Sequence, residues 1–425
     1  MKIELKPVKF GGSIIIPPSK SLAHRGIIAA SLAEGISKIS NLNFSNDIKV
    51  TTNAMKSLGV EVDIFEDYEI IHGKEKLIRK NNVIDCGESG STIRFMIPIS
   101  LLADGEVTFT GEGKLPTRPL GVFHKIFDEQ GIKYSHGEEE LPLTIDGKLR
   151  PGKFEVRGDI SSQFITGLLF TLPKLDAESE IIVTTNLESK GYIDLTLDIL
   201  DRFGIKIINE NYERFIIPGN QRYKAHDYRV EGDFSQIAFW LVGGLLNDGM
   251  ECLGMNPNSL QGDKAILGIL ESMGADISIE GNKISITGKK THGATIDLSQ
   301  CPDLGPIITV LASLSEGETR IINSSRLRIK ESDRITSMTT ELNKLGANIV
   351  ETEDGMIIQG VESLKGGVEV DAWNDHRVAM ALGIASTRCE KPITLTGAES
   401  VKKSYPHFWE EFKEMGGNKN GVNLG

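Results

Sequence analysis

Six short segments of this 425-residue chain gather residue types that bind anions or move protons. Each segment follows an apolar, strand-like stretch and leads directly into an apolar, helix-like stretch. They are SIIIPPSKS (13–21), VIDCGESGS (83–91), FEVRGDISS (154–162), YRVEGDFSQ (228–236), TIDLSQCPD (295–303) and VEVDAWNDH (368–376). The start of a helix offers unbonded N–H groups and the positive end of its dipole. The six joins therefore predict six places suited to phosphate or carboxylate.

Eight cationic side chains lie on these joins or on loops near them: Lys20, Arg25, Arg94, Arg118, Lys330, Arg334, Arg377 and Lys403. The whole chain is acidic, with 47 Lys and Arg against 59 Asp and Glu and a net charge of −12. This balance argues against nucleic acid or an anionic membrane as the main partner, so a positive site must be local. Two phosphorylated carboxylic acids carry about −5 to −6 charges, which such a set of cations can neutralise.

Two acids, Asp303 and Glu331, stand among these cations and are candidates for proton transfer. Ser161, Ser162 and Gln163 add uncharged hydrogen-bonding groups at the third join. Each residue also has an ordinary structural explanation as a helix cap or a surface charge. The run SSRLRIKESDRI (324–335), for example, is equally compatible with a surface helix held by ion pairs three and four residues apart.

The elements that position these residues repeat along the chain. Lys20, Gly90, Ser162, Ser235, Asp303 and Asp375 stand at the six predicted helix starts and are 70, 72, 73, 68 and 72 residues apart. A second series of glycines has a similar period and predicts helices that end in a C′ glycine: Gly59, Gly131, Gly204, Gly274, Gly346 and Gly416. Such a period indicates one strand–helix–strand–helix–strand unit used six times. A repeat alone is also compatible with a non-catalytic protein.

The bulk properties place these units in a globular protein of two domains. A chain of 425 residues exceeds what one core usually supports, and the polar stretch 220–228 is the best break between three units and three units. No apolar run approaches the ~20 residues of a membrane helix, and the first residues lack the pattern of a secretory signal. The four cysteines have no metal-ligand or disulfide spacing, which favours reduced thiols in the cytoplasm.

Five motifs in register with the repeat carry a family resemblance: PPSKSLAHR, SGSTIR, ISSQF, IKESDR and NDHR. Together they resemble the EPSP synthase (3-phosphoshikimate 1-carboxyvinyltransferase) family over essentially the whole chain. The resemblance implies an α/β fold, the two-lobed inverse α/β barrel, with six βαβαββ repeats, three per lobe. The N-terminal lobe would span 15–227, the C-terminal lobe 1–14 plus 228–425, and the active site would lie in the cleft between them.

The resemblance also implies the reaction. The enolpyruvyl group of phosphoenolpyruvate would pass to the 5-hydroxyl of shikimate 3-phosphate through a tetrahedral intermediate, with release of phosphate. No metal and no organic cofactor is implied, and the partners would be the two small-molecule substrates, with no nucleic acid and no membrane. The sequence gives no strong sign of oligomerisation, so we expect a monomer in the cytoplasm.

The positions that match the motifs of the family give the expected site residues. The shikimate 3-phosphate residues are Lys20, Ser21, Arg25, Ser161, Ser162, Gln163, Ser189, Tyr192, Asp303, Arg326 and Lys330. The phosphoenolpyruvate residues are Lys20, Gly90, Arg118, Gln163, Arg334, Arg377 and Lys403. The catalytic residues are Asp303 as general base and Glu331, which with Lys20 or Lys403 would handle the methylene proton and the departing phosphate.

Two positions depart from the best-known family pattern, since Arg326 and Glu88 each stand where asparagine is common. They put the shikimate contact at 326 and the polarity at 88 in question. Gly90, in contrast to alanine, leaves room beside phosphoenolpyruvate, and we therefore expect sensitivity to glyphosate.

Other readings remain possible from the residues. The sister enolpyruvyl transferase that acts on UDP-N-acetylglucosamine usually has a reactive cysteine where this chain has Gly113, and no residue from 103 to 124 is a cysteine. A non-catalytic binder of phosphorylated metabolites has no need of Asp303 and Glu331 among the cations. An RNA enzyme that processes phosphate ends is expected to be less acidic and to carry stacking aromatic residues.

Overall fold

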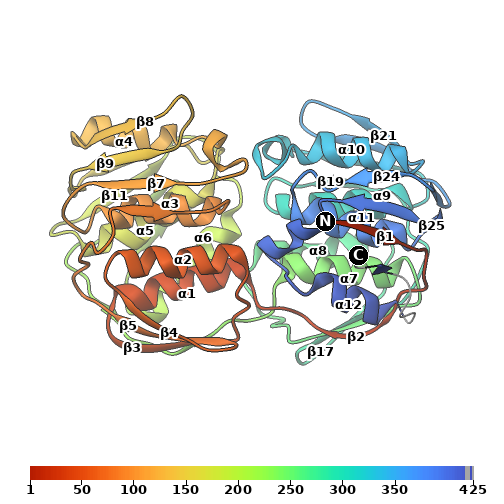
Figure 1. Ribbon diagram of the computed structural model, residues 1–425, viewed down its shortest axis with the longest axis horizontal. Helices are drawn as coiled ribbons and strands as arrows, with labels where there is room; N and C mark the ends of the chain where they lie inside the picture. The colour runs from red at the N-terminus through yellow and green to blue at the C-terminus, as the bar shows by residue number, and fades with distance from the viewer. Residues whose placement is uncertain (417–421, 424–425) are drawn as a thin grey trace. The chain divides into compact units, whose positions relative to one another are not determined.

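The computed structural model describes residues 1–416 and 422–423 (Figure 1). The chain forms two compact units, Lys20–Val230 and Met1–Ser19 with Glu231–Gly425. We call them the N-terminal and the C-terminal lobe. The chain passes between the lobes twice, after Ser19 and after Val230.

The N-terminal lobe contains helices and strands in alternation. Its helices are α1 (Lys20–Leu32), α2 (Asn46–Ser57), α3 (Gly90–Ser100), α4 (Gly121–Gln130), α5 (Ser162–Thr171) and α6 (Lys190–Arg202), with the 3-10 turns η1 (Leu115–Thr117) and η2 (Leu172–Lys174). Its strands are β3 (Ala33–Ser40), β4 (Glu61–Ile64), β5 (Tyr68–Gly73), β6 (Val83–Asp85), β7 (Val107–Thr110), β8 (Lys133–His136), β9 (Leu143–Asp146), β10 (Lys153–Val156), β11 (Ser179–Val183), β12 (Ile208–Glu210), β13 (Arg214–Ile217), β14 (Tyr223–Lys224) and β15 (Tyr228–Arg229).

Three sheets of this lobe share one topology. Their strand orders are β6-β7-β9-β8, β10-β11-β13-β12 and β14-β3-β5-β4, with β15 also paired to β3. In each sheet the first pair is parallel and the other pairs are antiparallel. In the third sheet the parallel partner of β3 is β14, which comes from the end of the lobe. The last segment of the lobe therefore completes the sheet of its first repeat.

The C-terminal lobe also alternates helices and strands. Its helices are α7 (Phe234–Leu245), α8 (Ala265–Ser272), α9 (Gly305–Ser313), α10 (Arg334–Lys344), α11 (His376–Ser386) and α12 (Phe408–Met415), with η3 (Gly262–Lys264), η4 (Pro302–Leu304), η5 (Ser325–Ile329) and η6 (Ala398–Lys403). Its strands are β1 (Lys2–Leu5), β2 (Gly12–Ile15), β16 (Met250–Leu253), β17 (Ile277–Glu280), β18 (Lys283–Ile286), β19 (Thr295–Asp297), β20 (Glu318–Ile322), β21 (Asn348–Glu351), β22 (Met356–Gln359), β23 (Leu364–Gly366), β24 (Glu369–Asp371), β25 (Cys389–Lys391), β26 (Ile393–Thr396) and β27 (Val422–Asn423).

The sheets of this lobe repeat the topology three more times. The orders are β17-β18-β16-β2, β19-β20-β22-β21 and β24-β26-β1-β27, and a separate pair joins β23 to β25. Each four-stranded sheet again has one parallel pair at one end, and its other pairs are antiparallel. Strands β1 and β2 supply positions in two of these sheets, although they come from the start of the chain. The six-fold repeat predicted from the sequence is confirmed.

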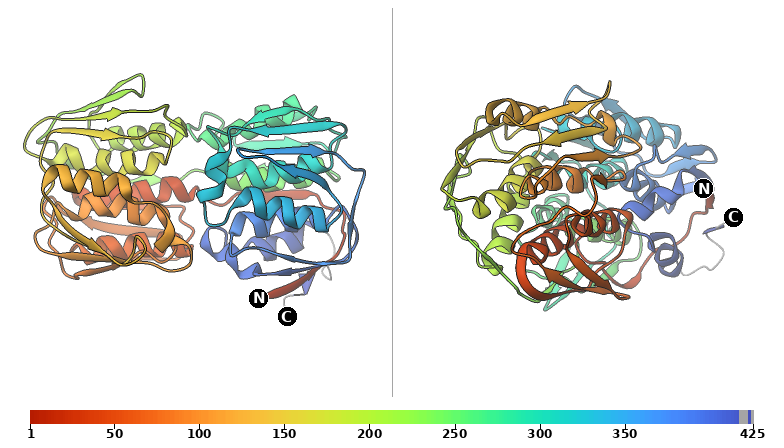
Figure 2. Two further views of the ribbon diagram at one scale, coloured as in Figure 1. Left: turned by 90° about the horizontal axis from the view of Figure 1, so that it is seen from above. Right: turned by 60° about the vertical axis from the view of Figure 1, so that its left-hand side comes forward.

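Each lobe has inner helices, and the strands lie along its outer faces (Figure 2). Helices α1, α3 and α5 in one lobe and α7, α9 and α11 in the other are buried on nearly every side. They are inner helices because, beyond the polar residues near their N-terminal ends, their residues are apolar or small all round. In the C-terminal lobe α7, α9 and α11 pack against one another, and in the N-terminal lobe α3 packs against α5. The predicted α/β class, with helices inside and sheets outside, is confirmed.

The glycine series marks helix ends as predicted, with one exception. Gly131 has φ of 67° as the left-handed C-cap of α4, and Gly59, Gly204, Gly274 and Gly346 also have positive φ. Gly416 has φ of −73°, so the prediction of a left-handed C′ glycine is wrong there.

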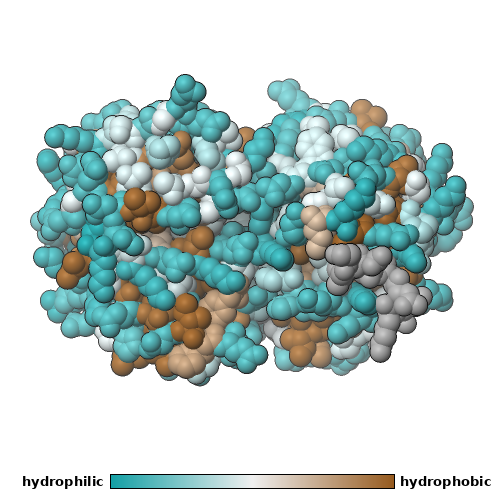
Figure 3. Space-filling model, in the orientation of Figure 1, coloured by the Kyte–Doolittle hydropathy of each residue, from teal (hydrophilic) through white to brown (hydrophobic). Residues whose placement is uncertain are grey.

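Hydrophilic side chains cover much of the face shown in Figure 3, and the cysteines are buried. On the face shown in Figure 3, apolar side chains lie in small groups between hydrophilic ones. Within residues 1–416 and 422–423, no helix is long and apolar enough to cross a membrane. The four cysteines are buried and form no disulfide, and burial raises the pKa of each thiol.

Candidate active site

The start of α1 places Lys20, Ser21 and Arg25 in the N-terminal lobe, where α2 and α6 hold the two cations. Lys20 Nζ donates to Asp47 Oδ2 of α2 at 2.6 Å. The buried Arg25 guanidinium donates to Thr196 Oγ1 at 2.9 Å and to the Tyr192 carbonyl at 3.0 Å, both on α6. Arg25 is therefore fixed in direction before any ligand arrives.

A chain of hydrogen bonds connects α1 to the start of α3. His24 Nδ1 lies 2.7 Å from Thr51 Oγ1, which lies 2.6 Å from Thr92 Oγ1. The Thr92 hydroxyl and its backbone N–H both donate to Ser89 Oγ, the N-cap of α3. Burial, together with Lys20 and Arg25, holds the pKa of His24 well below its ordinary value, so this histidine is neutral.

Gly90 and Arg118 lie against each other. A Cβ atom built on Gly90 would lie 2.5 Å from Arg118 Nη1 and 2.7 Å from its Cζ. Glycine is thus the residue that lets the guanidinium of Arg118 cover the first turn of α3. Arg118 itself follows η1 and is buried.

Gln163 is held by two groups on α3. Arg94 Nη1 donates to Gln163 Oε1 at 2.8 Å, and Gln163 Nε2 donates to Ser91 Oγ at 2.9 Å. Arg94 also donates to the carbonyl of Pro119 at 3.2 Å, which ties the Arg118 loop to α3. These bonds orient the side chain of Gln163 from α5 toward α3.

The predicted phosphate-binding serines stand at the starts of α5 and α6, two helices that pack together. Ser161 caps α5 by accepting from the Gln163 N–H, and Ser162 is buried beside it. Ser189 precedes α6 with φ of 57°, a left-handed conformation that is uncommon for serine. Tyr192 lies in the first turn of α6, where its carbonyl accepts from Arg25.

In the C-terminal lobe, three cationic side chains converge on Asp303 in η4. Its Oδ1 accepts from Arg334 Nη1 at 3.0 Å and lies 3.2 Å from Lys330 Nζ. Its Oδ2 accepts from Arg377 Nη2 at 3.1 Å. The family resemblance assigned these four residues to one site, and in the structure each of the three cations contacts Asp303.

Arg334 also binds two further acidic side chains, Glu331 and Asp375. It donates to Glu331 Oε2 at 2.8 Å and to both oxygens of Asp375, at 2.8 and 3.2 Å. Asp375 also caps α11 by accepting from the Arg377 N–H. The sequence indicates only a helix cap at Asp375. Its pairing with Arg334 was not predicted, because the two residues are 41 positions apart.

Two more predicted cations lie in this lobe. Lys403 Nζ at the end of η6 donates to the carbonyl of Asn374 at 2.5 Å, directly before Asp375. Arg326 is buried in η5, and its charge helps to lower the pKa of Lys330. Arg377 also donates to Ser235 Oγ on α7 at 2.9 Å.

The charges of this cluster control its proton affinities. Burial by itself raises the pKa of Asp303, but the charges of Arg377, Lys330 and Arg334 hold that pKa well below 3.8. Burial lowers the pKa of Lys330, and Asp303 opposes this effect. In the free protein Asp303 is therefore an ionised carboxylate surrounded by cations.

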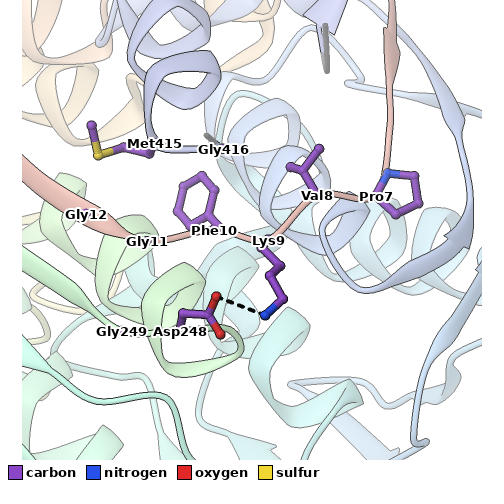
Figure 4. A pocket seen from close by; sticks show the side chains of 10 residues that line it. All are labelled: Pro7, Val8, Lys9, Phe10, Gly11, Gly12, Asp248, Gly249, Met415 and Gly416. Carbon is purple, nitrogen blue, oxygen red and sulfur yellow. Dashed lines mark ion pairs between the residues drawn. The ribbon is translucent and has the colours of Figure 1, made fainter. Parts of the chain in front are cut away.

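The described residues contain no group of three or more His, Cys, Asp or Glu side chains that could hold a metal ion. A pocket of about 620 Å³ lies elsewhere in the C-terminal lobe and is lined by the segment Pro7–Gly12 together with Asp248, Gly249, Met415 and Gly416 (Figure 4). An ion pair of 3.6 Å joins Lys9 to Asp248 there. None of these residues belongs to the clusters described above.

Comparison with known proteins gives one consistent result. The family model described as EPSP synthase (3-phosphoshikimate 1-carboxyvinyltransferase) matches residues 5–412. Proteins with the name 3-phosphoshikimate 1-carboxyvinyltransferase are 56% identical in Clostridium novyi, covering 98% of this chain and 97% of that one, and 55% identical in Clostridium perfringens strain 13, covering 98% of each. A solved structure of EPSP synthase from Acinetobacter baumannii superposes with a TM-score of 0.81 at 26% identity, covering 99% of both chains.

Proposed function

The chain belongs to the EPSP synthase (3-phosphoshikimate 1-carboxyvinyltransferase) family, and on this premise we propose how its residues divide the work. The reaction transfers the enolpyruvyl group of phosphoenolpyruvate to the 5-hydroxyl of shikimate 3-phosphate, giving 5-enolpyruvylshikimate 3-phosphate and phosphate. The two polar clusters, one in each lobe, serve one ternary complex of both substrates with the enzyme.

The N-terminal cluster binds mainly shikimate 3-phosphate. Ser161, Ser162 and Ser189 bind its phosphate, since hydroxyls and N–H groups at helix starts suit that anion. Arg25 and Tyr192 hold the carboxylate and ring side, and Gln163 lies between the two ligands. The rigid hydrogen bonds of Arg25 and Gln163 support this assignment, because a preordered site loses less entropy on binding.

The phosphoenolpyruvate residues come from both lobes. Arg118, Arg334 and Arg377 supply guanidinium groups that bind carboxylate or phosphate through two parallel hydrogen bonds. Lys20 and Lys403 act as point charges and can also donate a proton. The full set is Lys20, Gly90, Arg118, Gln163, Arg334, Arg377 and Lys403.

The observation that carries the mechanism is the Asp303 carboxylate in contact with Lys330, Arg334 and Arg377. A carboxylate whose pKa is so low is ionised and ready to accept a proton, but it is a weak base. When the anionic substrates bind these same cations, the cations stabilise Asp303 less, and its pKa rises toward the range useful for catalysis. Substrate binding therefore strengthens the base that removes the 5-hydroxyl proton.

With these roles for the residues, we propose the following bond changes. As Asp303 takes the proton, the 5-oxygen bonds to C2 of the enol and the methylene carbon accepts a proton, giving the tetrahedral intermediate. In the second step the same carbon loses a proton, the C2–O bond to phosphate breaks, and phosphate leaves. We assign proton transfer at the methylene carbon to Glu331 together with Lys20 or Lys403.

The test is phosphate release from phosphoenolpyruvate in the presence of shikimate 3-phosphate. Asp303→Asn keeps the size of the side chain but removes the base, and we expect kcat to fall by about 10²- to 10⁴-fold. Asp354→Asn, an exposed change in the same lobe, serves as the matched control. If Asp303→Asn binds both ligands and turns over at nearly the wild-type rate, the assignment of the base is wrong.

The alternative acceptor, UDP-N-acetylglucosamine, is tested in the same assay, and we expect no phosphate release with it. We further propose that the enzyme acts as a monomer in the cytoplasm. Sedimentation at assay concentrations and fractionation of the source cells test these two points.

A further inference from the structure

The turn before α11 has a backbone that L side chains rarely adopt. Trp373 has φ of 54° and Asn374 has φ of 52°, so two neighbouring non-glycine residues are left-handed. For a bulky residue such as tryptophan this conformation is an outlier and persists only where surrounding contacts enforce it. The turn lies directly before Asp375, the partner of Arg334.

Glu341 of α10 supplies the contacts that hold this turn. Its Oε1 accepts from the indole Nε1–H of Trp373 at 2.8 Å, and its Oε2 accepts from the Asp371 N–H at 3.1 Å. Its side chain is 1% exposed, whereas Trp373 is 37% exposed. A buried carboxylate thus bonds the turn at its first residue and at its left-handed tryptophan.

A second bond inside the turn works in the same direction. Asp371 Oδ1 accepts from the Trp373 N–H at 2.6 Å. With the backbone of Asp371 fixed by Glu341, this bond sets the direction in which the chain leaves β24. Trp373 is therefore bonded through its backbone and through its indole.

The turn presents two groups to the candidate site. The carbonyl of Asn374 accepts from Lys403 Nζ at 2.5 Å, and Asp375 accepts from the Arg334 guanidinium. On α10, Arg334 and Glu341 are seven residues apart, which is about two turns and the same face. One helix therefore bonds the segment 371–375 at both of its ends.

We propose that Glu341 is a positioning residue for the phosphoenolpyruvate half of the site. By holding Trp373 and Asn374 left-handed, it fixes the carbonyl that orients Lys403 and the carboxylate that orients Arg334. Glu341 itself touches no substrate. The inference rests on the proposed role of Lys403 and Arg334 in binding phosphoenolpyruvate.

The alternative is that Glu341 only stabilises its own helix through Lys344, whose Nζ lies 2.8 Å from Glu341 Oε2. The side chain of Lys344 is 44% exposed. Within the described part of the chain, both hydrogen bonds of its Nζ go to the Glu341 carboxylate and none goes to the turn. Lys344→Met removes this ion pair and leaves the bonds to Trp373 and Asp371 intact, so it is the matched control.

The experiment compares Glu341→Gln, Trp373→Phe and Lys344→Met in steady-state assays with each substrate varied. Glutamine cannot accept from both the indole and the Asp371 N–H, and phenylalanine removes the indole donor while it keeps an aromatic ring at position 373. We expect KM for phosphoenolpyruvate to rise about five- to twentyfold in both variants. KM for shikimate 3-phosphate should change by less than about twofold, and Lys344→Met should change neither constant.

A rescue variant separates positioning from general stability. Glycine adopts the left-handed region without strain and keeps the backbone carbonyl. Asn374→Gly added to Glu341→Gln should therefore bring KM for phosphoenolpyruvate back toward the wild-type value. If the double variant is no better than Glu341→Gln alone, backbone strain is not what Glu341 controls.

The outcomes distinguish this inference from the proposed function. A wild-type protein that releases no phosphate from the two substrates contradicts the proposed function itself. An active wild type in which Trp373→Phe and Glu341→Gln leave KM for phosphoenolpyruvate unchanged contradicts only the role of Glu341. Equal changes in both KM values and in kcat, shared by Lys344→Met, also contradict it. Should Glu341→Gln fail to fold, the half-exposed Trp373→Phe change still decides.

Discussion

Arg334 Nε donates to Asp375 Oδ2 at 2.8 Å, and the two side chains are 1% and 0% exposed. Burial raises the pKa of Asp375, but the Arg334 guanidinium outweighs it and the pKa lies below 3.8. The pair connects the first residue of α10 with the cap of α11, so it joins two helices as well as two charges.

Removing one member of this pair should destabilise the fold. Asp375→Asn leaves a buried guanidinium with less compensation and removes the anionic cap of α11, so we expect the free energy of unfolding to fall by about 3 kcal/mol. Urea denaturation measures this. Asp276→Asn, which breaks the exposed pair with Lys289, is the control and should cost less than about 1 kcal/mol. Equal losses in the two variants would contradict a special role of the buried pair.

Gly90→Ala should weaken the binding of phosphoenolpyruvate. The new methyl group meets the guanidinium of Arg118 at 2.5 Å, so the arginine must move away from the start of α3. We expect KM for phosphoenolpyruvate to rise about tenfold, the loss of one charge-assisted hydrogen bond.

Glyphosate inhibition checks the same contact with a different ligand. We expect the wild type to be sensitive and Gly90→Ala to be more resistant. Gly121→Ala, where an added Cβ has open space, is the control. Resistance in the wild type would end the argument from the space at Gly90.

Glu69 should make stability fall as pH rises from about 4.5 to about 7. Its side chain on β5 is buried and accepts one hydrogen bond, from Thr52 Oγ1 at 2.8 Å. Burial raises its pKa from 4.5 to about 7. Between these values the folded state keeps the proton and the unfolded state releases it, so the free energy of unfolding decreases with pH.

Glu69→Gln tests this directly. At pH 5 the variant and the wild type should be about equally stable, because the folded wild-type carboxyl is neutral and little is lost by replacing it. At pH 8 the variant should be more stable by about 3 kcal/mol, the equivalent of a shift of that size. Glu66→Gln, an exposed change in the adjacent turn, is the control. A wild type whose stability is constant from pH 5 to pH 8 would contradict the buried-carboxyl account.

Sequence predicted those parts of the fold that local signals encode. The helices α1, α3 and α5 begin at Lys20, Gly90 and Ser162, as the spacing of the joins required. In the fifth repeat Asp303 lies in a short 3-10 turn and the helix begins at Gly305, because Pro302 and Pro306 alter the first turn. Local chemistry of that kind shifts a boundary without changing the repeat.

The partners of the site residues could not be predicted in this way. Asp47 and Glu341 carry no motif, and they are 27 and 32 residues from Lys20 and Trp373. The run SSRLRIKESDRI was compatible with a surface helix, but the structure divides it into η5 and the start of α10 and buries Arg334. Its charges find their partners on other segments, and only the fold brings those segments together.

Asp47→Asn should slow turnover while leaving the fold intact. Lys20 Nζ lies 2.6 Å from Asp47 Oδ2, and the two side chains are 17% and 13% exposed, so the pair is accessible to an arriving ligand. Without the carboxylate charge, the ammonium loses the partner that directs it, and we expect kcat to fall about tenfold, as for one displaced proton donor. The free energy of unfolding should change by less than about 1 kcal/mol, because the pair is not sealed from water. Asp63→Asn, which removes the exposed partner of His72 in the same lobe, should alter neither quantity. Steady-state assays and urea denaturation on the same preparations measure both, and a wild-type kcat in Asp47→Asn would mean that Lys20 is oriented by other groups.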